Sequence, residues 1–321
     1  MKKKSSSLTI GIDVGGTFIK SGVVREGRIL IHTSVPTAQF KTPAQLQNGL
    51  IRMALSLSEK TDGSIQGIGI GVPGLVRYPV GIVHSCANIR GWHDVPLKAI
   101  LQRKLKWPVF IDNDANLMTL AEWVHGAGRG VDNLVCMTLG TGVGGGLILN
   151  GRLYRGSAGW AGEIGHMPVN ETGPACACGG KACLERYVGN NDILKRVRRQ
   201  LRSGVKSRLS DLIQTEGSLT PPLIDRACEL GDPLARKTWE KVGVTIGIVC
   251  AGVVNLLNPE RIVIGGGISK AGRWIFEPLR KTVEQRAMRG LGSVEIVPAK
   301  LGSSAGMIGA ALLAHGEKVR S

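Results

Sequence analysis

The sequence pattern that most constrains the fold occurs twice: a short apolar strand, a glycine-rich turn and a β-hairpin. The first copy runs from Leu8 to Val35 and the second from Asn133 to Arg155. In the second copy the two hairpin strands are joined by Asn150-Gly151, a dipeptide typical of two-residue turns. The duplication predicts an α/β protein with two related lobes and a cleft between them.

The chain length agrees with two lobes, because 321 residues is about twice the usual size of one domain. We place the boundary near residue 120, with a small N-terminal lobe over residues 1–120 and a large lobe over residues 121–302. The segment from about residue 303 to residue 321 contains a helical stretch, Met307 to His315, and we expect it to return to the first lobe.

Several further elements follow from local spacing. Thr42 as N-cap and Pro43 in the first helical position begin an amphipathic helix, whose apolar positions are Leu46, Leu50, Met53 and Leu57. Strands are expected over residues 65–72, 109–112 and 262–264, and a helix over residues 115–125. The apolar stretch 242–257 is interrupted by polar residues and glycines, which favours a buried helix over a membrane span.

The chain is strongly basic, with 41 Lys and Arg against 24 Asp and Glu, a net charge of +17. Such a charge fits a nucleic acid, a membrane surface or small anions, and it does not choose among them. The densest basic run, residues 195–208, has seven basic side chains and no acid, with Leu194, Val197, Leu201 and Val205 at helical spacing. We favour a solvated helix face over a nucleic-acid site for this run.

The seven cysteines do not form the even, spaced pattern of a secreted disulfide scaffold, which favours a reducing cytoplasm. The basic N-terminus resembles the start of an export signal, but Asp13 and two glycines interrupt the apolar run too early. No export segment and no membrane span are therefore expected. Four isolated cysteines in apolar surroundings are expected in the core: Cys86, Cys136, Cys228 and Cys250.

The first glycine-rich turn has the composition of a phosphate-binding loop. Gly15 and Gly16 lack β-carbons, so backbone N–H groups can face phosphate oxygens, and Thr17 adds a hydroxyl donor. Asp13 is suited to hold a hydrated Mg²⁺, and Lys20 to offset phosphate charge.

Two more glycine clusters end strands in the second half of the chain. Gly140, Thr141 and Gly142 repeat the chemistry of the first loop, and Gly265-Gly266-Gly267 follows the strand over residues 262–264. Glycine clusters can also make turns alone, but three at strand ends favour a nucleotide. Neither a dinucleotide G-x-G-x-x-G motif after the first strand nor a Walker lysine motif is present in the sequence.

One imidazole and three thiols lie within 18 positions: His166, Cys176, Cys178 and Cys183. These are the ligand types and number of a closed tetrahedral zinc site. Since no ligand position remains for water, the zinc is expected to be structural. Three free buried thiols are the alternative, which the crowding beside Gly179 and Gly180 disfavours.

Polar side chains that suit a hydroxylated substrate occur in three places. Asn113, Asp114 and Asn116 lie where a strand ends and a helix begins, a frequent position for sites in α/β folds. A carboxylate there can accept a hydroxyl proton, although Asp114 and Asn116 are equally suited to cap the helix. Glu163 and Glu185 flank the predicted zinc loop, which would hold both acids in fixed positions.

Taken together, the motifs resemble those of the ROK sugar kinases (repressor, open reading frame, kinase) of the actin-like ATPase superfamily, over nearly the full chain. The resemblance rests on the following segments: Asp13 to Thr17, Asn113 to Asn116, Leu139 to Gly142, Glu163 to His166, Cys176 to Gly179, Cys183 to Glu185 and Asn258 to Gly267. Each motif alone is weak, and the combination is specific.

The resemblance implies an ATP-dependent transfer of a phosphoryl group to the 6-hydroxyl of a hexose. Asp114 looks like the general base, and Gly74 is similar to a backbone contact near the sugar. The other hydroxyls would be held by Asn113, Glu163, His166 and Glu185. One ring nitrogen of His166 would bind zinc and the other would face the sugar. The ATP phosphates would lie between the two glycine loops, with adenosine near Gly266 and Gly267, in a cleft that closes over the substrate. A homodimer or higher homo-oligomer is also expected.

One position departs from the family pattern, which usually has glycine just before the third cysteine, where this chain has Ala182. If that position needs a positive φ, the zinc loop would shift slightly.

The choice of substrate and role stays open in the sequence. Glucose is the first expectation, with N-acetylmannosamine or N-acetylglucosamine as the alternative, and the segment Asn88 to Trp92 resembles glucokinase-like members. The family also contains repressors with an added N-terminal helix-turn-helix. Because the first strand begins near Leu8, we expect no DNA-binding domain here, and a regulatory or nucleic-acid-binding protein is the more distant alternative.

Overall fold

The computed structural model describes residues 8–86, 91–291 and 293–315. Its contacts divide the chain into two compact units. Unit 1 comprises Met1–Asp132, Gly146–Gly162 and Lys300–Ser321, and unit 2 comprises Asn133–Gly145 and Glu163–Ala299.

Unit 1 is built on a five-stranded sheet in the order β3-β2-β1-β4-β8. The strands are β1 (Leu8–Val14), β2 (Phe18–Arg25), β3 (Arg28–Pro36), β4 (Ile65–Val72) and β8 (Val109–Asn113). The first three strands form an antiparallel meander, while β4 and β8 run parallel to β1. The sheet therefore brings the carboxyl ends of β1, β4 and β8 to one edge.

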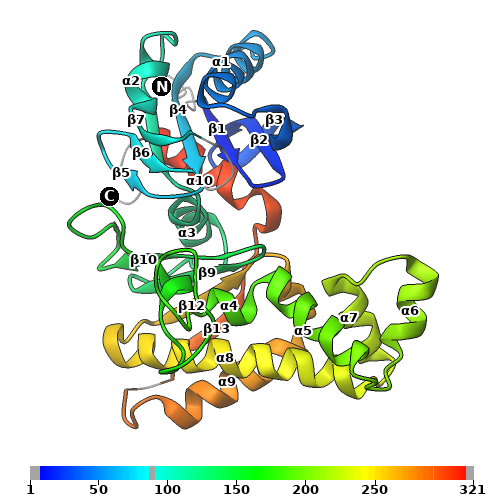
Figure 1. Cartoon of the computed structure of the whole chain (residues 1–321). Helices are drawn as coiled ribbons and strands as arrows, with labels where there is room; N and C mark the ends of the chain where they lie inside the picture. Colours follow the sequence, from blue (N-terminus) through cyan, green and yellow to red (C-terminus); the bar gives the residue numbers. More distant parts are fainter. Residues whose placement is uncertain (1–7, 87–90, 292, 316–321) are drawn as a thin grey trace. The chain divides into compact units, whose positions relative to one another are not determined.

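Helices α3 (Asp114–His125) and α10 (Ala305–Ala314) pack together, and α10 also contacts β1 and β4 (Figure 1). The approach of α10 to the sheet is close, because a β-carbon on Gly69 would lie 1.7 Å from the carbonyl oxygen of Ala310. Helix α1 (Pro43–Glu59) buries Leu46, Leu50 and Leu57 in the core of the unit. A short helix, α2 (Leu97–Gln102), precedes β8.

Unit 1 also carries a small three-stranded antiparallel sheet in the order β5-β6-β7. Its strands are β5 (Val76–Arg77), β6 (Ile82–Ser85) and β7 (His93–Val95). These strands have two to four residues each, too short for a period-two pattern to predict them.

The second large sheet repeats the strand order of the first as β11-β10-β9-β12-β13. Its strands are β9 (Leu134–Leu139), β10 (Val143–Leu149), β11 (Arg152–Tyr154), β12 (Arg261–Gly265) and β13 (Glu295–Pro298). Strands β9, β12 and β13 are parallel, and β10 and β11 form the hairpin at Asn150 and Gly151. The repeated strand order confirms the predicted duplication and the α/β class.

In unit 2 the long helix α8 (Pro233–Leu257) packs against α9 (Arg273–Arg286). The remaining helices are α4 (Glu185–Val188), α5 (Asn190–Arg202), α6 (Leu209–Glu216) and α7 (Pro221–Glu229). Among the described residues, α8 is the one helix with the length and composition to cross a membrane, and 56% of its most apolar window is buried within the chain. This burial agrees with the core helix predicted over residues 242–257.

Most predicted elements are confirmed within a few residues. Thr42 accepts the backbone N–H of Gln45 and so caps α1, as expected. The basic helix is shorter than its apolar spacing indicates, because α5 ends at Arg202 and Val205 is exposed beyond it. The buried residues of α5 are Ile193 and Val197. The four isolated cysteines are buried, as predicted.

Candidate active site

A group of hydrogen-bonded polar side chains lies at the end of β8 and in the first turn of α3. Asn113 caps α3, since its Oδ1 accepts the backbone N–H groups of Ala115 and Asn116 at 2.9 and 3.2 Å. Asn116 is buried and donates from Nδ2 to Asp112 Oδ1 at 3.1 Å. Asn113 is thus the N-cap of α3. Asp114 occupies the first helical position, where the helix dipole favours a carboxylate and its Oδ1 accepts the backbone N–H of Ala115 at 2.9 Å.

Beneath this cluster, a buried ion pair joins two distant segments of unit 1. Asp112 is fully buried, and Arg155 Nε donates to its Oδ2 at 2.8 Å. The guanidinium of Arg155 also lies 3.7 Å from the ring centroid of Tyr78. The pair fixes the backbone just before Asn113 and Asp114. Arg155 carries no local sequence signal for this role, because it meets Asp112 across 43 positions of the chain.

The Asn113 side chain links the end of β8 to the segment after β4. Its Nδ2 donates to the carbonyl oxygen of Gly74 at 3.0 Å. Gly74 has φ +120°, and a β-carbon there would lie 2.1 Å from the Ser85 carbonyl oxygen. Glycine is thus required at this position, and the structure brings together two residues that the resemblance places beside the sugar.

The first glycine loop is a tight turn between β1 and β2. The N–H of Gly15 donates to the Phe18 carbonyl at 3.1 Å, and Thr37 Oγ1 donates to the Gly15 carbonyl at 2.7 Å. Gly15 therefore serves the turn itself. Gly16 and Thr17 are exposed, which leaves their backbone accessible to a ligand.

At the end of β1, burial raises the pKa of Asp13 to about 6, although the charge of Lys20 acts in the opposite direction. Lys20 Nζ donates to the Ser303 carbonyl at 2.8 Å, which ties β2 to the segment preceding α10. The desolvated carboxyl of Asp13 lacks a full counter-charge in the protein alone. A hydrated divalent cation would supply it, so the donor fits the expected Mg²⁺.

The second glycine loop, in unit 2, is held by its own backbone and by an acid. Gly140 N–H donates to the Gly142 carbonyl at 3.0 Å, and the Gly140 carbonyl accepts from Asn190 at 2.9 Å. Glu185 Oε2 accepts the N–H of Val143 at 2.9 Å. A β-carbon on Gly140 would meet no protein atom within 4 Å. Packing therefore does not explain this glycine, which strengthens the phosphate-binding interpretation.

In the third glycine cluster, Gly265-Gly266-Gly267, one glycine is explained by packing within the protein and one is not. Gly266 has φ +88°, and a β-carbon there would lie 2.2 Å from the carbonyl oxygen of Leu139. Packing against the end of β9 thus suffices to explain it. Gly267 has open space around its Cα, so a ligand is the better explanation for glycine at that position.

Three expected sugar-binding side chains lie together in unit 2. His166 Nε2 is 3.9 Å from a carboxylate oxygen of Glu163. Burial raises the pKa of Glu163; the nearby His166 lowers it and the negative charge of Glu185 raises it further. The three side chains are therefore close enough to interact electrostatically. Such a group of acceptors and an imidazole suits the hydroxyls of a polyol.

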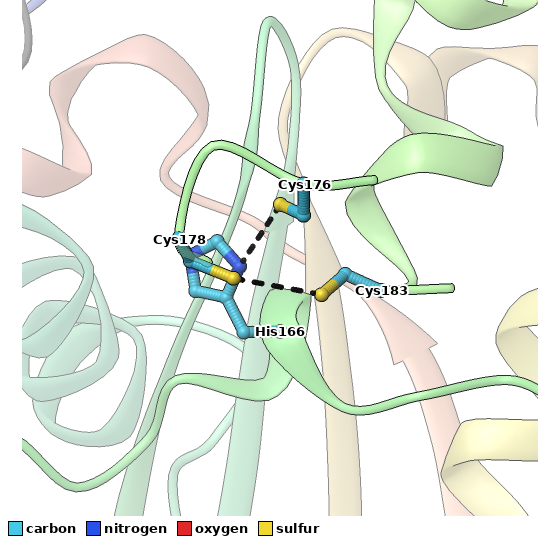
Figure 2. A group of neighbouring side chains, drawn as sticks. All are labelled: His166, Cys176, Cys178 and Cys183. Atoms are coloured by element: carbon cyan, nitrogen blue, oxygen red, sulfur yellow. Dashed lines mark hydrogen bonds between the residues drawn. The ribbon is translucent and has the colours of Figure 1, made fainter. Parts of the chain in front are cut away.

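The predicted metal ligands converge in the loop that precedes α4 (Figure 2). His166 Nδ1 lies 3.7 Å from Cys176 Sγ, and the Sγ atoms of Cys178 and Cys183 are 3.6 Å apart. All four ligand atoms lie within 4.8 Å of one another. His166 thus turns Nδ1 toward the thiols and Nε2 toward Glu163.

This donor set fits zinc. Sulfur ligands about 2.3 Å from a tetrahedral zinc ion are about 3.8 Å from each other, close to the spacing observed here. A hydrogen bond from the Gly180 backbone lowers the pKa of Cys178, which favours the thiolate that binds metal. Burial raises the pKa of Cys183 to about 12, so this thiol needs a cation to ionise near neutral pH.

Ala182, where the family pattern has glycine, is fully buried and has φ +57°. This left-handed conformation costs an alanine about 1 kcal/mol relative to glycine. Its backbone is fixed on both sides, by bonds to Pro174 and Val169 at 2.9 Å each. The loop therefore keeps the glycine-type conformation despite the β-carbon.

Comparisons with known proteins agree with the motifs. The model of the ROK family matches residues 9–317. A glucokinase of Halalkalibacterium halodurans is 37% identical over 94% of this chain and 92% of its own length. A xylose repressor of Caldicellulosiruptor bescii is 34% identical over 87% of this chain and 70% of its own length.

A solved structure gives the same result. The ROK family glucokinase from Streptomyces griseus, crystallised with glucose and AMPPNP, superimposes with a TM-score of 0.84 at 33% identity. The match covers 96% of this chain and 99% of that chain. The duplicated sheets, the motifs and these similarities lead to one conclusion: the chain belongs to the ROK family and has its actin-like ATPase fold.

Proposed function

We propose that this chain phosphorylates glucose at the 6-hydroxyl with ATP as the phosphoryl donor. That it is a hexokinase-type ATP phosphotransferase follows from its family and from the glucokinases that match it over nearly their whole length. The observation that carries the site assignment is the end of β8. There Asn113 Oδ1 caps α3 and Asp112 Oδ1 accepts the Asn113 N–H, so both residues fix the backbone. The Asp114 carboxylate follows in the first turn of α3, where it accepts the N–H of Ala115.

In this mechanism Asp114 accepts the proton of the sugar 6-hydroxyl as its oxygen bonds to the γ-phosphorus of ATP. The bond from that phosphorus to the β,γ-bridging oxygen breaks, and ADP leaves with the electron pair. Asp112 and Arg155 act through the backbone, by fixing the position of Asp114. General-base catalysis of this kind contributes about 10²- to 10⁴-fold in rate.

The remaining sugar hydroxyls are assigned to Asn113, Glu163, His166 and Glu185, with the Gly74 backbone nearby. The phosphates of ATP are assigned to Gly16, Thr17 and the loop Gly140-Thr141-Gly142, with Gly15 shaping its turn and Gly266 and Gly267 near the adenosine. Asp13 would hold Mg²⁺, which would neutralise part of the phosphate charge, and Lys20 would neutralise more of it. Support comes from the exposed backbone of Gly16 and Thr17 and from the open space at Gly140 and Gly267.

His166, Cys176, Cys178 and Cys183 are proposed to hold one structural zinc ion. A zinc ion bound there would fix the tautomer of His166, because Nδ1 faces the thiols and Nε2 would then carry the hydrogen toward the substrate. Metal analysis of the purified chain is expected to give about one zinc per chain, and loss of that zinc in Cys178→Ser. Active, zinc-free wild-type protein would refute the structural role.

The substrate is tested by ADP release with a panel of hexoses, including N-acetylmannosamine and N-acetylglucosamine. We expect the highest kcat/KM with glucose and a product phosphorylated at position 6. In Asp114→Ala, kcat is expected to fall by about 10²- to 10⁴-fold, whereas Asp62→Ala, which changes an exposed aspartate, retains wild-type rates. Wild-type turnover in Asp114→Ala would refute the assignment of Asp114 as the general base. A higher kcat/KM with an N-acetylated sugar than with glucose would make that sugar the substrate.

Similarity to a xylose repressor supports a second candidate, a sugar-responsive regulator. Such a protein would bind sugar without turnover. ADP release above the ATP-only background distinguishes the two, since it requires phosphoryl transfer. We further propose a cytoplasmic location and a homo-oligomer; sedimentation of the purified chain tests the latter.

A further inference from the structure

Outside the site described above, three metal-ligating side chains meet on the small sheet of unit 1. His84 lies on β6, and His93 and Asp94 lie on β7. In the pairing of these strands Val83 faces Val95 and Ser85 faces His93, so His84 lies opposite Asp94. The proposed kinase reaction uses none of the three.

The carboxylate of Asp94 lies between the two imidazoles. His84 Nδ1 is 2.6 Å from Asp94 Oδ1, and His93 Nε2 is 3.4 Å from Asp94 Oδ2. The two imidazole ring centroids are 5.2 Å apart. One ligand atom from each of the three residues lies within 4.8 Å of the other two. Small side-chain rotations would therefore bring all three to a common ion about 2.1 Å from each.

The backbone of Asp94 makes this convergence possible. Neighbouring residues of a strand normally point to opposite faces of the sheet, which would separate His93 from Asp94. Asp94 has φ +46°, a left-handed conformation that interrupts the alternation. Both side chains therefore reach the position that faces His84.

We propose that His84, His93 and Asp94 bind one transition-metal dication. Two imidazoles and one carboxylate are the ligands that Zn²⁺, Ni²⁺ and Cu²⁺ accept, and Mg²⁺ and Ca²⁺ prefer sites made of oxygen atoms. The side chain of His84 is 41% exposed and that of His93 78%, so an ion can enter directly from solvent. The exposed side also leaves room for water to complete the coordination.

A tryptophan beside the cluster provides an optical signal. The ring of Trp160 is 5.8 Å from that of His84, centroid to centroid, and is inclined to it by 31°. A paramagnetic ion bound to His84 would quench this indole. Trp160 also precedes the proposed sugar-binding Glu163 by three residues, so binding here can be followed beside the segment that leads to the kinase site.

The experiment uses the full chain, without a histidine tag and loaded with one equivalent of zinc, titrated with Ni²⁺ at pH 7.5. Fluorescence quenching and calorimetry are followed together. We expect one Ni²⁺ to bind beyond the zinc, and His93→Ala to weaken its binding by at least about tenfold. His32→Ala, which removes another exposed histidine of unit 1, is the matched control and keeps wild-type affinity.

Trp160→Phe separates the signal from the binding: we expect the quenching to shrink and the calorimetric affinity to stay the same. Equal Ni²⁺ affinity in wild type and His93→Ala overturns the proposal, since the ion would then bind elsewhere, at the cysteine cluster for example. Absence of a second equivalent in wild type overturns it as well. The titration contains neither ATP nor sugar, so its result does not depend on the kinase assignment.

Discussion

The two large sheets share one strand order, yet their strand ends carry different chemistry. In the first sheet Asp13 is the residue before the last in β1, and β8 ends in Asp112 and Asn113, which Asp114 follows. In the second, β9 and β12 end in glycine runs, and β13 ends at Pro298. The strand ends of the first sheet thus carry carboxylates beside a glycine loop, and those of the second sheet carry glycine loops without carboxylates.

This difference corresponds to the two tasks of a phosphoryl transfer. A base and a metal ligand need charged side chains at fixed positions, and burial and ion pairing provide that control in the first sheet. Nucleotide phosphates and adenosine need close approach to the backbone, which side chains would obstruct. We infer that the base and the metal ligand come from the first copy alone, whereas glycine loops of both copies bind the nucleotide.

The largest expected effect on stability comes from the ion pair under the first set of strand ends. Arg155→Met leaves the fully buried Asp112 carboxylate without its guanidinium and is expected to lower the free energy of unfolding by about 3–5 kcal/mol. Arg152→Met changes an exposed arginine of the same hairpin and should have little effect. Thermal and urea unfolding measure both variants. Equal stability of the two variants would show that the pair does not hold this edge.

The next effect concerns the carboxyl of Asp13 and depends on pH. Burial raises its pKa from 3.8 to about 6 in the folded chain, so its contribution favours folding below pH 4 and is lost as the pH rises through 6. Without Mg²⁺ and nucleotide, the free energy of unfolding of Asp13→Asn should rise by about 2 kcal/mol relative to that of wild type when the pH is raised from 4 to 7. Urea unfolding at both pH values measures this difference. Parallel pH profiles for the two proteins would contradict the assignment of the raised pKa.

The smallest effect lies in unit 2, in the zinc loop. Ala182→Gly removes the strain of a left-handed alanine and should stabilise the zinc-loaded chain by up to about 1 kcal/mol. Ala175→Gly, an exposed alanine in the same loop, serves as the control. A loss of stability in Ala182→Gly would mean that packing of the methyl group outweighs the strain.

Local patterns in the sequence predicted much of the fold. The repeated strand, glycine turn and hairpin predicted two sheets of equal topology, and Thr42-Pro43 predicted the start of α1, because these features depend on near neighbours. The cysteine spacing likewise predicted a cluster that the structure brings together. The predicted boundary near residue 120 stays a prediction.

The remainder depends on contacts between distant residues. Arg155 meets Asp112 across 43 positions, and the strands of the small sheet are too short to show a period. The left-handed backbone of Ala182 and Asp94 cannot be read from residue types that usually avoid it. Residues 87–90 lie outside the described part of the chain, so the prediction for Asn88 to Arg90 stays a prediction, as do the roles of the site residues.

The division of tasks is tested most directly by calorimetric binding of a non-hydrolysable ATP analogue, with Mg²⁺, to Gly140→Ala and Asp114→Asn side by side. A methyl group on Gly140 meets no protein atom within 4 Å, so its effect falls on the ligand alone. We predict that Gly140→Ala weakens the analogue by about tenfold, roughly 1.4 kcal/mol, and that Asp114→Asn binds it as tightly as wild type. Wild-type affinity in Gly140→Ala together with weakened binding in Asp114→Asn would contradict the account.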